Sequence, residues 1–452
     1  MPSSVRSAVA PLYLFSCLLL GGSTQGIWAN ALLQLAGIVI IAWAVIDRGS
    51  PLSSTARSMV LIAIAAAIVA VSQLVPLPVS FFWANGVRGR IAEGYSLLGL
   101  RTPALPISVT PYESLSALFC LIPSLAIFSA IVRLNAFRRS WLAAALVGAT
   151  LLGILLGALQ VASSGAGTRW YLYDQTNVGV GVGFFANANH MATLLVLSIP
   201  FLAAIASVAR NNNLQRYSAL VSILVAAVPL IIVGIALNGS LAGYALAVPV
   251  IASSVILILP KPNRFRIWLA GAAAIFAIAA VGALASSSIG AGKIGTDASV
   301  SIVSRGQLLR TTAQAIGDFM PFGSGLGSFA KVYRLYERPD TVTSEWVIHA
   351  HNDYAEVALE LGVGGALLTL AFLAWWGLRI RAVWREGEGG PFAMAASIAS
   401  AAVLVQSLVD FPLRTAAISA CFAMCVALLA DRKTPLREEV ADLRPTRHIV
   451  IR

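Results

Sequence analysis

Long apolar runs are the feature that most limits what this chain can fold into. Twelve segments, each roughly 17–22 residues long, carry few charged side chains, and a helix of about 20 apolar residues crosses a bilayer. They lack the alternation of polar and apolar residues that marks a transmembrane β-barrel. We therefore predict an all-α, polytopic bundle of about 12 transmembrane helices, near residues 7–22, 27–46, 58–76, 113–132, 141–161, 190–208, 218–237, 241–260, 267–286, 356–377, 392–410 and 414–430.

The composition supports a membrane protein. Hydrophobic residues make up 58% of the chain and charged residues 11%, whereas soluble domains carry about 25% charged residues. The net charge of +12 could indicate nucleic-acid binding, but the basic residues are scattered through loops, where they more often fix topology. No nucleic-acid partner is therefore expected. All four cysteines lie in apolar segments, which indicates neither a disulfide framework nor a zinc site.

The basic residues divide the loops into two sets. Short loops between alternate spans, together with Arg6 and the tail from Arg432 to Arg452, hold 20 of the 31 Lys and Arg, and short basic loops stay in the cytoplasm. We predict both termini on that side, with one transmembrane domain at 1–430 and a basic cytoplasmic tail at 431–452. The larger loops, near 77–112, 162–189 and 287–355, are then extracytoplasmic. The first is expected to hold an interfacial amphipathic helix or a re-entrant piece, and the last, between spans nine and ten, is the longest.

The end of the longest loop concentrates residues that can do chemistry. Residues 349–354 read His-Ala-His-Asn-Asp-Tyr, and an apolar helix with Glu356 and Glu360 follows. Asp353 and Glu356 have the spacing of a helix capping box, which is a structural role. An acid as deep in a span as Glu360 is costly to bury and is therefore a functional candidate.

The two histidines need not share a role. In an extended segment His349 and His351 would point to opposite sides, so only one of them has to face a site. A single histidine is usually no more than a hydrogen-bonded residue, but one beside Asn352 at the membrane interface can act as a general base. The His-x-His-x-Asp pattern also resembles the metal motif of metallo-β-lactamase-like hydrolases. Tyr354 replaces the next histidine of that motif and a transmembrane helix follows, so we predict no metal site.

Arg305 and Arg310 lie in a segment of the same loop that is expected to be helical. A guanidinium suits a phosphate or pyrophosphate because its planar fork can bond two oxygens at once. The glycine-rich segment 321–329 follows. It is not a dinucleotide-binding fingerprint, since Ser328 takes the place of the third glycine and no βαβ unit surrounds it. A tight turn with close backbone approach is expected there.

Four patches resemble, in order, motifs of the O-antigen ligase and polymerase superfamily of bacterial inner-membrane glycosyltransferases. The resemblance covers residues 180–370 by motif and the whole chain by topology. The patches are residues 187–190 (Asn-Ala-Asn-His), residues 239–243 (Gly-Ser-Leu-Ala-Gly), Arg305 with residues 321–327, and residues 351–354 with 360–362.

The resemblance implies a GT-C-like fold with a periplasmic active site in the bacterial inner membrane. It implies transfer of a glycan from undecaprenyl pyrophosphate to a hydroxyl of lipid A core or of a growing polysaccharide, within the membrane lipid and without a metal or cofactor. By the same resemblance, His351 activates the acceptor hydroxyl, Arg305 binds the pyrophosphate and stabilises the leaving charge, and direct attack inverts the anomeric centre. The further substrate-binding candidates are Arg310, Asn352, His349 and Glu360.

Two positions depart from the family pattern. Many members carry arginine where this chain has Ala188 and Leu241. Either other cations, such as Arg310 or Arg169, bind the pyrophosphate, or the donor of this protein differs from that of the family. The leading interpretation is a lipid-linked glycan transferase of the O-antigen ligase type, with lipid A core or a growing polysaccharide as the acceptor. An O-antigen or exopolysaccharide polymerase and a protein O-glycosylating transferase are alternatives within the same class.

A polysaccharide transporter or flippase is the alternative from another class. Twelve spans and an acid inside one of them fit it, and so does the Asp-Phe-Pro sequence at 410–412. Transporters, however, usually place their polar residues in broken helices at the bilayer midplane. Here the polar residues lie in an external loop and at a helix start, which favours a transferase.

Overall fold

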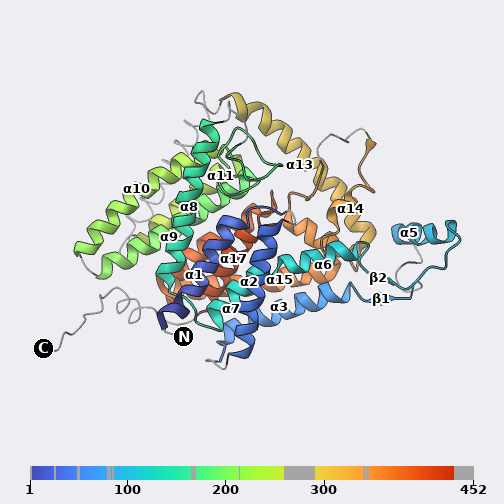
Figure 1. Cartoon of the computed structure of the whole chain (residues 1–452), viewed down its shortest axis with the longest axis horizontal. Coiled ribbons are helices and arrows are strands. Elements are labelled where there is room, and N and C mark those ends of the chain that lie inside the picture. Colours follow the sequence, from blue (N-terminus) through green and yellow to red (C-terminus); the bar gives the residue numbers. More distant parts are fainter. Residues whose placement is uncertain are drawn as a thin grey trace.

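The computed structural model describes residues 3–24, 27–47, 51–78, 83, 86–163, 169–212, 214–258, 291–339, 342 and 346–431. Within these residues the chain is mostly helical, as the sequence predicts (Figure 1), and strands are limited to one antiparallel pair, β1 (Pro76–Leu77) and β2 (Leu105–Pro106). The helices are α1 (Ser3–Leu20), α2 (Trp28–Ile46), α3 (Ser54–Ser72), α5 (Gly86–Leu97), α6 (Pro111–Cys120), α7 (Ile122–Val132), α8 (Arg139–Ala162), α9 (Ala188–Asn212), α10 (Leu214–Asn238), α11 (Leu241–Ile258), α13 (Ala291–Phe319), α14 (Phe329–Tyr333), α15 (Asp353–Glu386), α16 (Gly390–Gln406), the 3-10 helix η2 (Pro412–Arg414) and α17 (Ala416–Ala430).

Many of these helices have the length and composition of membrane spans. Within the described residues, seven helical segments are long and apolar enough to cross a bilayer: α2, α3, α6 with α7, α8, α9, α11 and α15. Helices α1, α16 and α17 and the later part of α10 are shorter apolar helices. The chain is therefore a membrane protein. The span expected at 267–286 and the tail from residue 432 lie outside the described residues, so the total of twelve spans stays a prediction.

Two predicted segments gain detail. The single span expected at 113–132 is two helices, α6 and α7, which meet at Leu121. Pro123 lies in the first turn of α7, where its missing N–H breaks the hydrogen-bond ladder. The helix expected around Arg305 and Arg310 is confirmed as part of α13, which fills much of the longest loop.

The bundle is built around α9. In its apolar window 83% of the residues are buried, the highest share among the candidate spans of the described chain. Helices α8, α10, α11 and α16 pack around it, and buried small residues such as Ala192 and Ala204 allow close approach. Residues 187–190 therefore stand at the start of the central helix.

Contacts made by α17 identify the two ends of the bundle. At the end of α17, Asp431 pairs with Arg139 at the start of α8, at 2.8 Å. Arg139 belongs to one of the short basic loops that the sequence assigns to the cytoplasm. At the opposite end of α17, the backbone N–H of Ala417 donates to the carbonyl oxygen of Gly21 at 3.0 Å. The candidate site described below lies at this second end, close to the start of α17.

The glycine-rich turn after α13 is locked into a break in α15. Gly362, inside α15, has φ +58° and ψ −143°, a conformation that is essentially restricted to glycine. Across this break, the N–H of Val363 donates to the carbonyl oxygen of Pro321 at 2.9 Å. A Cβ on either Gly323 or Gly362 would overlap the backbone of the other segment. The close backbone approach expected at 321–329 is thus confirmed, and it fixes α13 against α15.

Gln73, just after α3, holds the same turn from a third helix. Its buried side-chain nitrogen donates to the carbonyl oxygens of Phe322 and Glu360 at 3.0 and 2.8 Å. Its side-chain oxygen accepts from the N–H of Leu326 at 3.1 Å. A single amide therefore joins α3, the turn after α13 and α15.

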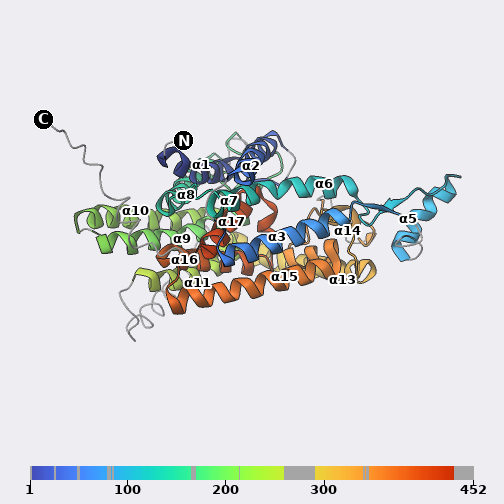
Figure 2. The same cartoon turned by 90° about the horizontal axis from the view of Figure 1, so that it is seen from below.

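Helix α5 projects from the bundle next to β1 and β2, as Figures 1 and 2 both show. Arg88 on α5 is buried and donates to the carbonyl oxygens of Ile107 and Gly323. Its guanidinium lies 5.0 Å from the centre of the Phe319 ring. The helix expected in loop 77–112 is therefore present and is tied to the turn after α13. Its position at a membrane interface stays a prediction.

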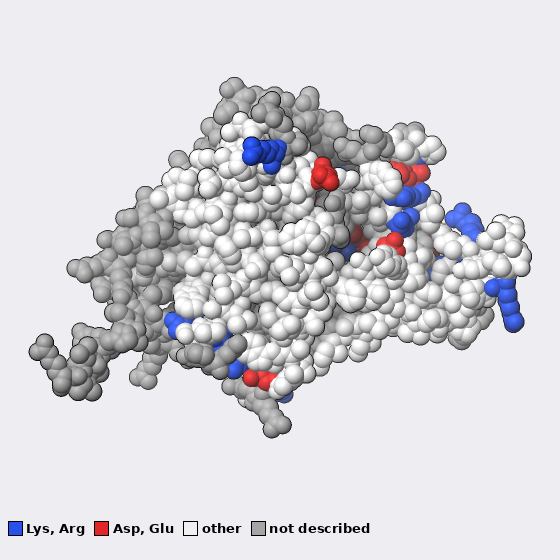
Figure 3. All heavy atoms as spheres, in the orientation of Figure 1, with Lys and Arg blue, Asp and Glu red and all other residues white. Residues whose placement is uncertain are grey.

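Charge is unevenly spread over the face drawn in Figure 3. One group of acidic and basic side chains surrounds a hollow towards α14 and α5, and another follows the lower edge. The described surface between these two groups is uncharged. An uncharged belt between two charged levels is what a lipid-facing surface requires.

Candidate active site

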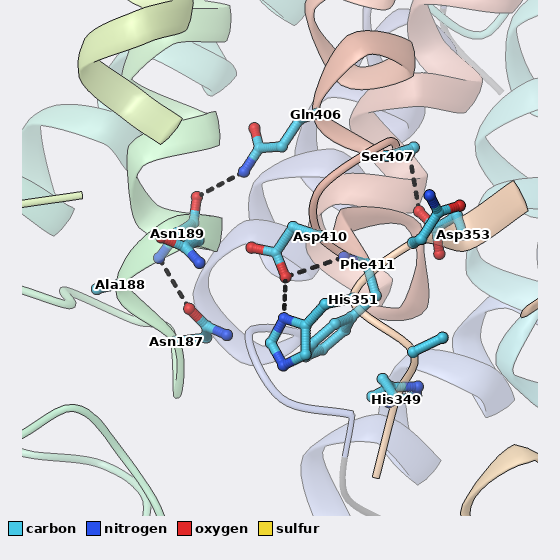
Figure 4. Close-up of polar contacts among 12 residues, drawn as sticks. Asn187, Ala188, Asn189, His349, His351, Asp353, Gln406, Ser407, Asp410 and Phe411 are labelled. Carbon is cyan, nitrogen blue, oxygen red and sulfur yellow. Dashed lines mark hydrogen bonds and ion pairs between the residues drawn. The ribbon is translucent and has the colours of Figure 1, made fainter. Parts of the chain in front are cut away.

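His351 is bound to a carboxylate that sequence reasoning does not connect with it. Its Nδ1 lies 3.1 Å from Oδ1 of Asp410 (Figure 4). Asp410 is fully buried in the turn between α16 and α17, whereas 34% of the His351 side chain is exposed. An ionised carboxylate only accepts hydrogen bonds, so Nδ1 carries a proton, and in the neutral ring Nε2 is then left as an acceptor. This is the arrangement of a general base and its orienting acid.

Asp410 is ionised at neutral pH. Burial alone would raise its pKa, but the hydrogen bond from His351, the neighbouring His190 and the backbone N–H of Phe411 lower the pKa to about 2. The N–H of Phe411 donates to Oδ1 at 3.0 Å. The carboxylate can therefore hold His351 in one tautomer over the pH range in which a histidine base works.

The backbone of His351 is strained. Its φ of +49° is left-handed, which costs a residue other than glycine roughly 1–3 kcal/mol. The flanking backbone holds it there: the N–H of Ala350 donates to Glu356 and the N–H of Asp353 donates to the carbonyl oxygen of Ser407, both at 2.9 Å. The segment is therefore not simply extended at His351. Such strain gathers at functional positions.

His349 has a carboxylate partner of its own. Its Nδ1 lies 2.9 Å from Oε1 of Glu356, and its ring centre lies 4.2 Å from that of Phe411. The rings of His351 and His190 meet the same phenyl ring nearly edge-on, with centres 4.9 and 5.0 Å away. Three of the four histidines in the chain therefore surround Phe411.

Arg414 neutralises the acids next to these histidines. Both of its terminal nitrogens donate to one oxygen of Glu360 at 3.1 Å, and the guanidinium lies 3.3 Å from Glu356 and 3.6 Å from Asp353. All three carboxyl groups are buried. Burial alone would lower the pKa of Arg414, but the three carboxylates raise it, so the guanidinium stays charged. Glu360 is predicted from the sequence to bind substrate, but one of its two carboxylate oxygens is hydrogen-bonded to Arg414.

The capping box predicted from Asp353 and Glu356 is wrong by one residue. Asn352 is the N-cap of α15, and its side-chain oxygen accepts from the N–H of Ala355 at 2.9 Å. Its side-chain nitrogen donates to the carbonyl oxygen of Leu408 at 2.9 Å. Asp353 and Glu356 serve the buried ion pairs instead. Asn352 therefore fixes the loop beside His351, and both ends of its amide are already bonded.

Residues 187–189 face the His351–Asp410 pair from the start of α9 (Figure 4). Asn189 accepts from the hydroxyl of Ser240 at 2.7 Å, which joins the first resembling patch to the second. The backbone oxygen of Asn189 also accepts from the side chain of Gln406 at 3.2 Å, near the end of α16. Patches that are far apart in the sequence therefore meet at one place.

Arg305 and Arg310 differ in their surroundings. Arg305 is partly buried and, within the described chain, has no hydrogen-bond or ion-pair partner, whereas Arg310 is exposed. Five positions correspond to about 140° around a helix, so the two project from different sides of α13. Leu308, one turn after Arg305, packs in the same buried cluster as Ala350. The Arg305 side of α13 thus faces the histidine segment, although no described contact joins Arg305 to His351 directly.

Arg169, the other cation considered from the sequence, is exposed. Its guanidinium lies 5.9 Å from the ring of the adjacent Trp170. As for a metal, no group of three or more His, Cys, Asp or Glu side chains in the described part of the chain could hold one.

Sequence reasoning does not select four of the residues that shape this site. Asp410 and Phe411 stand out only as part of the Asp-Phe-Pro sequence and His190 only as part of the patch at 187–190, and neither pattern places these residues beside His351. Arg414 has a usable signal, because it is a basic residue in a turn that the charge pattern assigns to the extracytoplasmic side. An exception to that pattern deserves a functional test before a structural role is assigned.

Comparison with known families points to the same part of the chain. Residues 226–370 match the family model described as O-antigen ligase. The matched segment contains Arg305, His351 and Glu360, whereas Asp410 and residues 187–190 lie outside it. A search of curated proteins found no match.

Proposed function

This chain belongs to the O-antigen ligase superfamily, and we propose that it moves a glycan from undecaprenyl pyrophosphate to a hydroxyl of lipid A core on the periplasmic face of the bacterial inner membrane. One observation carries the proposal above the others. A partly exposed histidine, His351, is held through Nδ1 by the buried carboxylate of Asp410, which leaves Nε2 available to a substrate.

In the proposed reaction, Nε2 of His351 accepts the proton of the acceptor hydroxyl while the hydroxyl oxygen attacks the anomeric carbon. The bond between that carbon and the phosphate oxygen breaks, and the pyrophosphate leaves with the electron pair. Asp410 fixes the tautomer of His351 and balances the charge of the imidazolium. A positioned base of this kind contributes about 10²–10⁴-fold to a rate. A single displacement inverts the anomeric centre.

Arg305 is the proposed pyrophosphate ligand. It has no ion-pair partner among the residues described, so its guanidinium is available to a ligand. Arg414, by contrast, is surrounded by three carboxylates and is already neutralised. A cation that is placed in advance stabilises the charge that develops on the leaving group without further reorganisation.

The proposed periplasmic side rests on the charge of the loops. The site lies at the end of the bundle away from Arg139 and Asp431, where the short basic loops are expected to be cytoplasmic. The Asp-Phe-Pro sequence that fits the transport alternative is the turn in which Asp410 bonds His351.

Substitution in a deletion strain tests the proposal. His351→Ala and Arg305→Ala are expected to abolish surface polysaccharide at normal membrane levels of the protein. His351→Asn is the stricter variant, since asparagine tolerates the left-handed backbone and removes only the base. Arg310→Ala is the matched control on the same helix. Normal amounts of surface polysaccharide with both the His351→Asn and the Arg305→Ala variants would contradict the transferase mechanism.

The banding of cell-surface glycan separates ligase from polymerase. For a ligase, the deletion strain loses all long chains on lipid A while polymer accumulates on the carrier lipid. Single-repeat products would indicate an O-antigen polymerase, and loss of secreted polymer with intact lipopolysaccharide would indicate an exopolysaccharide polymerase.

A further inference from the structure

The two oxygens of the buried Asp410 carboxylate differ in their hydrogen bonds. Oδ1 is bonded to His351 and to the N–H of Phe411. Oδ2 is buried and has no hydrogen-bond partner among the described residues. In Figure 4 this oxygen points away from His351 and towards Asn189. An unpartnered buried carboxylate oxygen is costly, so a ligand that donates a hydrogen bond to it gains affinity.

Two amide donors face the same place. The side-chain oxygen of Asn187 accepts from the N–H of Asn189 at 2.8 Å, and that of Asn189 accepts from Ser240. These bonds assign the amide nitrogens to the opposite sides of the two groups. Within the described chain neither nitrogen has a hydrogen-bond partner, and Figure 4 shows both turned towards His351 and Asp410.

Further hydrogen bonds hold the start of α9, which carries Asn187 and Asn189. Thr193 on α9 donates to the side-chain oxygen of Gln406 at 2.7 Å, and Gln406 donates to the backbone of Asn189 at 3.2 Å. The N–H of Asp410 in turn donates to the carbonyl oxygen of Gln406 at 2.9 Å. The two amides and the carboxylate are therefore held by one network, which favours a preorganised binding site.

Charge decides which chemical group fits. A helix start often binds phosphate through free backbone N–H groups, but here the N–H of Ala188 is bonded to Asn177 and that of His190 to the carbonyl oxygen of Asn187. The carboxylate of Asp410 would also repel an anion. Two amide donors beside one charged acceptor instead suit neutral hydroxyls, each of which both donates and accepts.

We infer that Asn187, Asn189 and Oδ2 of Asp410 form a subsite for the hydroxyls of the acceptor sugar adjacent to the hydroxyl that reacts at His351. The inference rests on the proposed function and adds to it the place where the acceptor binds. The pyrophosphate of the donor then lies elsewhere, towards Arg305. The acceptor ring would be gripped on the α9 side of His351 through neutral hydrogen bonds.

Steady-state kinetics of the full-length protein in liposomes test the subsite. The donor is the lipid-linked glycan extracted from the deletion strain, and the acceptor is the lipid A core glycolipid of that strain. Asn187→Ala and Asn189→Ala should each raise the KM for the acceptor about threefold to tenfold, the worth of one neutral hydrogen bond, and leave the donor KM unchanged. Asn187→Asp keeps the oxygen that caps α9 but replaces the free donor by a second carboxylate, so its acceptor KM should rise further.

Asn177→Asp is the matched control, since Asn177 also caps the start of α9 through its side-chain oxygen at 2.8 Å and is exposed. It should leave both KM values as in the wild type. Provided that the wild type transfers glycan, two results would overturn the inference. One is a higher donor KM in the Asn187 and Asn189 variants, and the other is an acceptor KM in these variants equal to that of the wild type. A wild-type protein that transfers nothing would instead remove the proposed function, and the subsite with it.

Discussion

The Nδ1 of His351 lies 3.1 Å from Oδ1 of Asp410, although 59 residues separate the two in the sequence. The bond connects the start of α15 with the turn between α16 and α17. It also connects residues 226–370, which match the O-antigen ligase family model, with a residue outside that match. The proposed base is therefore complete only when the last helices of the chain are packed in place.

Asp410→Asn should lower the rate of glycan transfer by roughly 10²–10⁴-fold, the full contribution of a positioned base. The asparagine oxygen can take the place of Oδ1 and accept from His351 and from the N–H of Phe411, but the negative charge that stabilises the imidazolium in the proposed reaction is lost. Initial rates in liposomes measure the effect, with Asp318→Asn as the control because Asp318 is exposed and, within the described chain, bonds only the Tyr336 hydroxyl. Since both residues act as one unit, combining Asp410→Asn with His351→Asn should cost no more than His351→Asn alone, and a lower rate in the double variant would contradict the pairing.

Acid should weaken the fold through the same carboxyl group. The pKa of Asp410 is lowered from 3.8 to about 2 against the effect of its burial, chiefly by the hydrogen bond from His351. A depressed carboxyl pKa stabilises the fold above the unfolded value, and this contribution is lost as the pH falls through the folded value. Thermal unfolding in detergent should therefore show wild type more stable than Asp410→Asn above pH 4, with the gap closing towards pH 2. A gap that stays constant over this range would show that Asp410 is not the titrating group.

The helices could be predicted from the sequence to within a few residues where a span is a plain apolar run. The span expected at 27–46 is α2 (Trp28–Ile46), and that at 241–260 is α11 (Leu241–Ile258). Apolar length reports these helices because the bilayer sets it. The break at Gly362 could not be predicted, since its cause is the turn at 321–327, which packs against it from another part of the chain.

The candidate site could be predicted only in part for a similar reason. His351 and Arg305 stand in recognisable motifs, and the structure gives both of them fitting surroundings. Asp410 and Arg414 are defined by which helices pack together, and a local pattern contains no information on that. The predicted capping box at Asp353 fails because those acids are bound by Arg414, which lies 61 residues further along.

Arg414→Gln should destabilise the protein by about 3 kcal/mol or more, because it leaves three buried carboxyl groups without their cation. Thermal unfolding measures the loss, and adding Glu360→Gln should restore part of it by removing one uncompensated charge. Arg381→Gln, on the exposed side of α15, is the matched control and should change little. Equal stability of Arg414→Gln and wild type would mean that the acids are not charged in the folded protein.

Gly362→Ala should cost at least about 3 kcal/mol, since its φ and ψ admit only glycine and a Cβ there would overlap the carbonyl oxygen of Pro321. Gly377→Ala lies in the same helix with nothing within 4 Å of the added carbon, and it should stabilise α15 by about 0.5–1 kcal/mol. Unfolding midpoints of the two variants provide the comparison. If Gly362→Ala were as stable as Gly377→Ala, the lock between α13 and α15 would not exist.

Substitutions of Arg305 and Arg310 should differ in their effect on activity, because the two residues project from different sides of α13. Arg305→Gln is expected to lower kcat/KM for the lipid-linked donor by about 10²-fold, because it removes a charged ligand of the developing pyrophosphate. Arg305→Lys should recover only part of this, since an ammonium lacks the planar fork that bonds two phosphate oxygens. Arg310 is exposed on another side of the helix, so Arg310→Gln should stay within about twofold of wild type, as surface charges contribute little. The decisive measurement is donor-saturation kinetics at fixed acceptor. If Arg310→Gln lost as much as Arg305→Gln, the phosphate would bind along the exposed face of α13, and the role given to Arg305 would pass to Arg310.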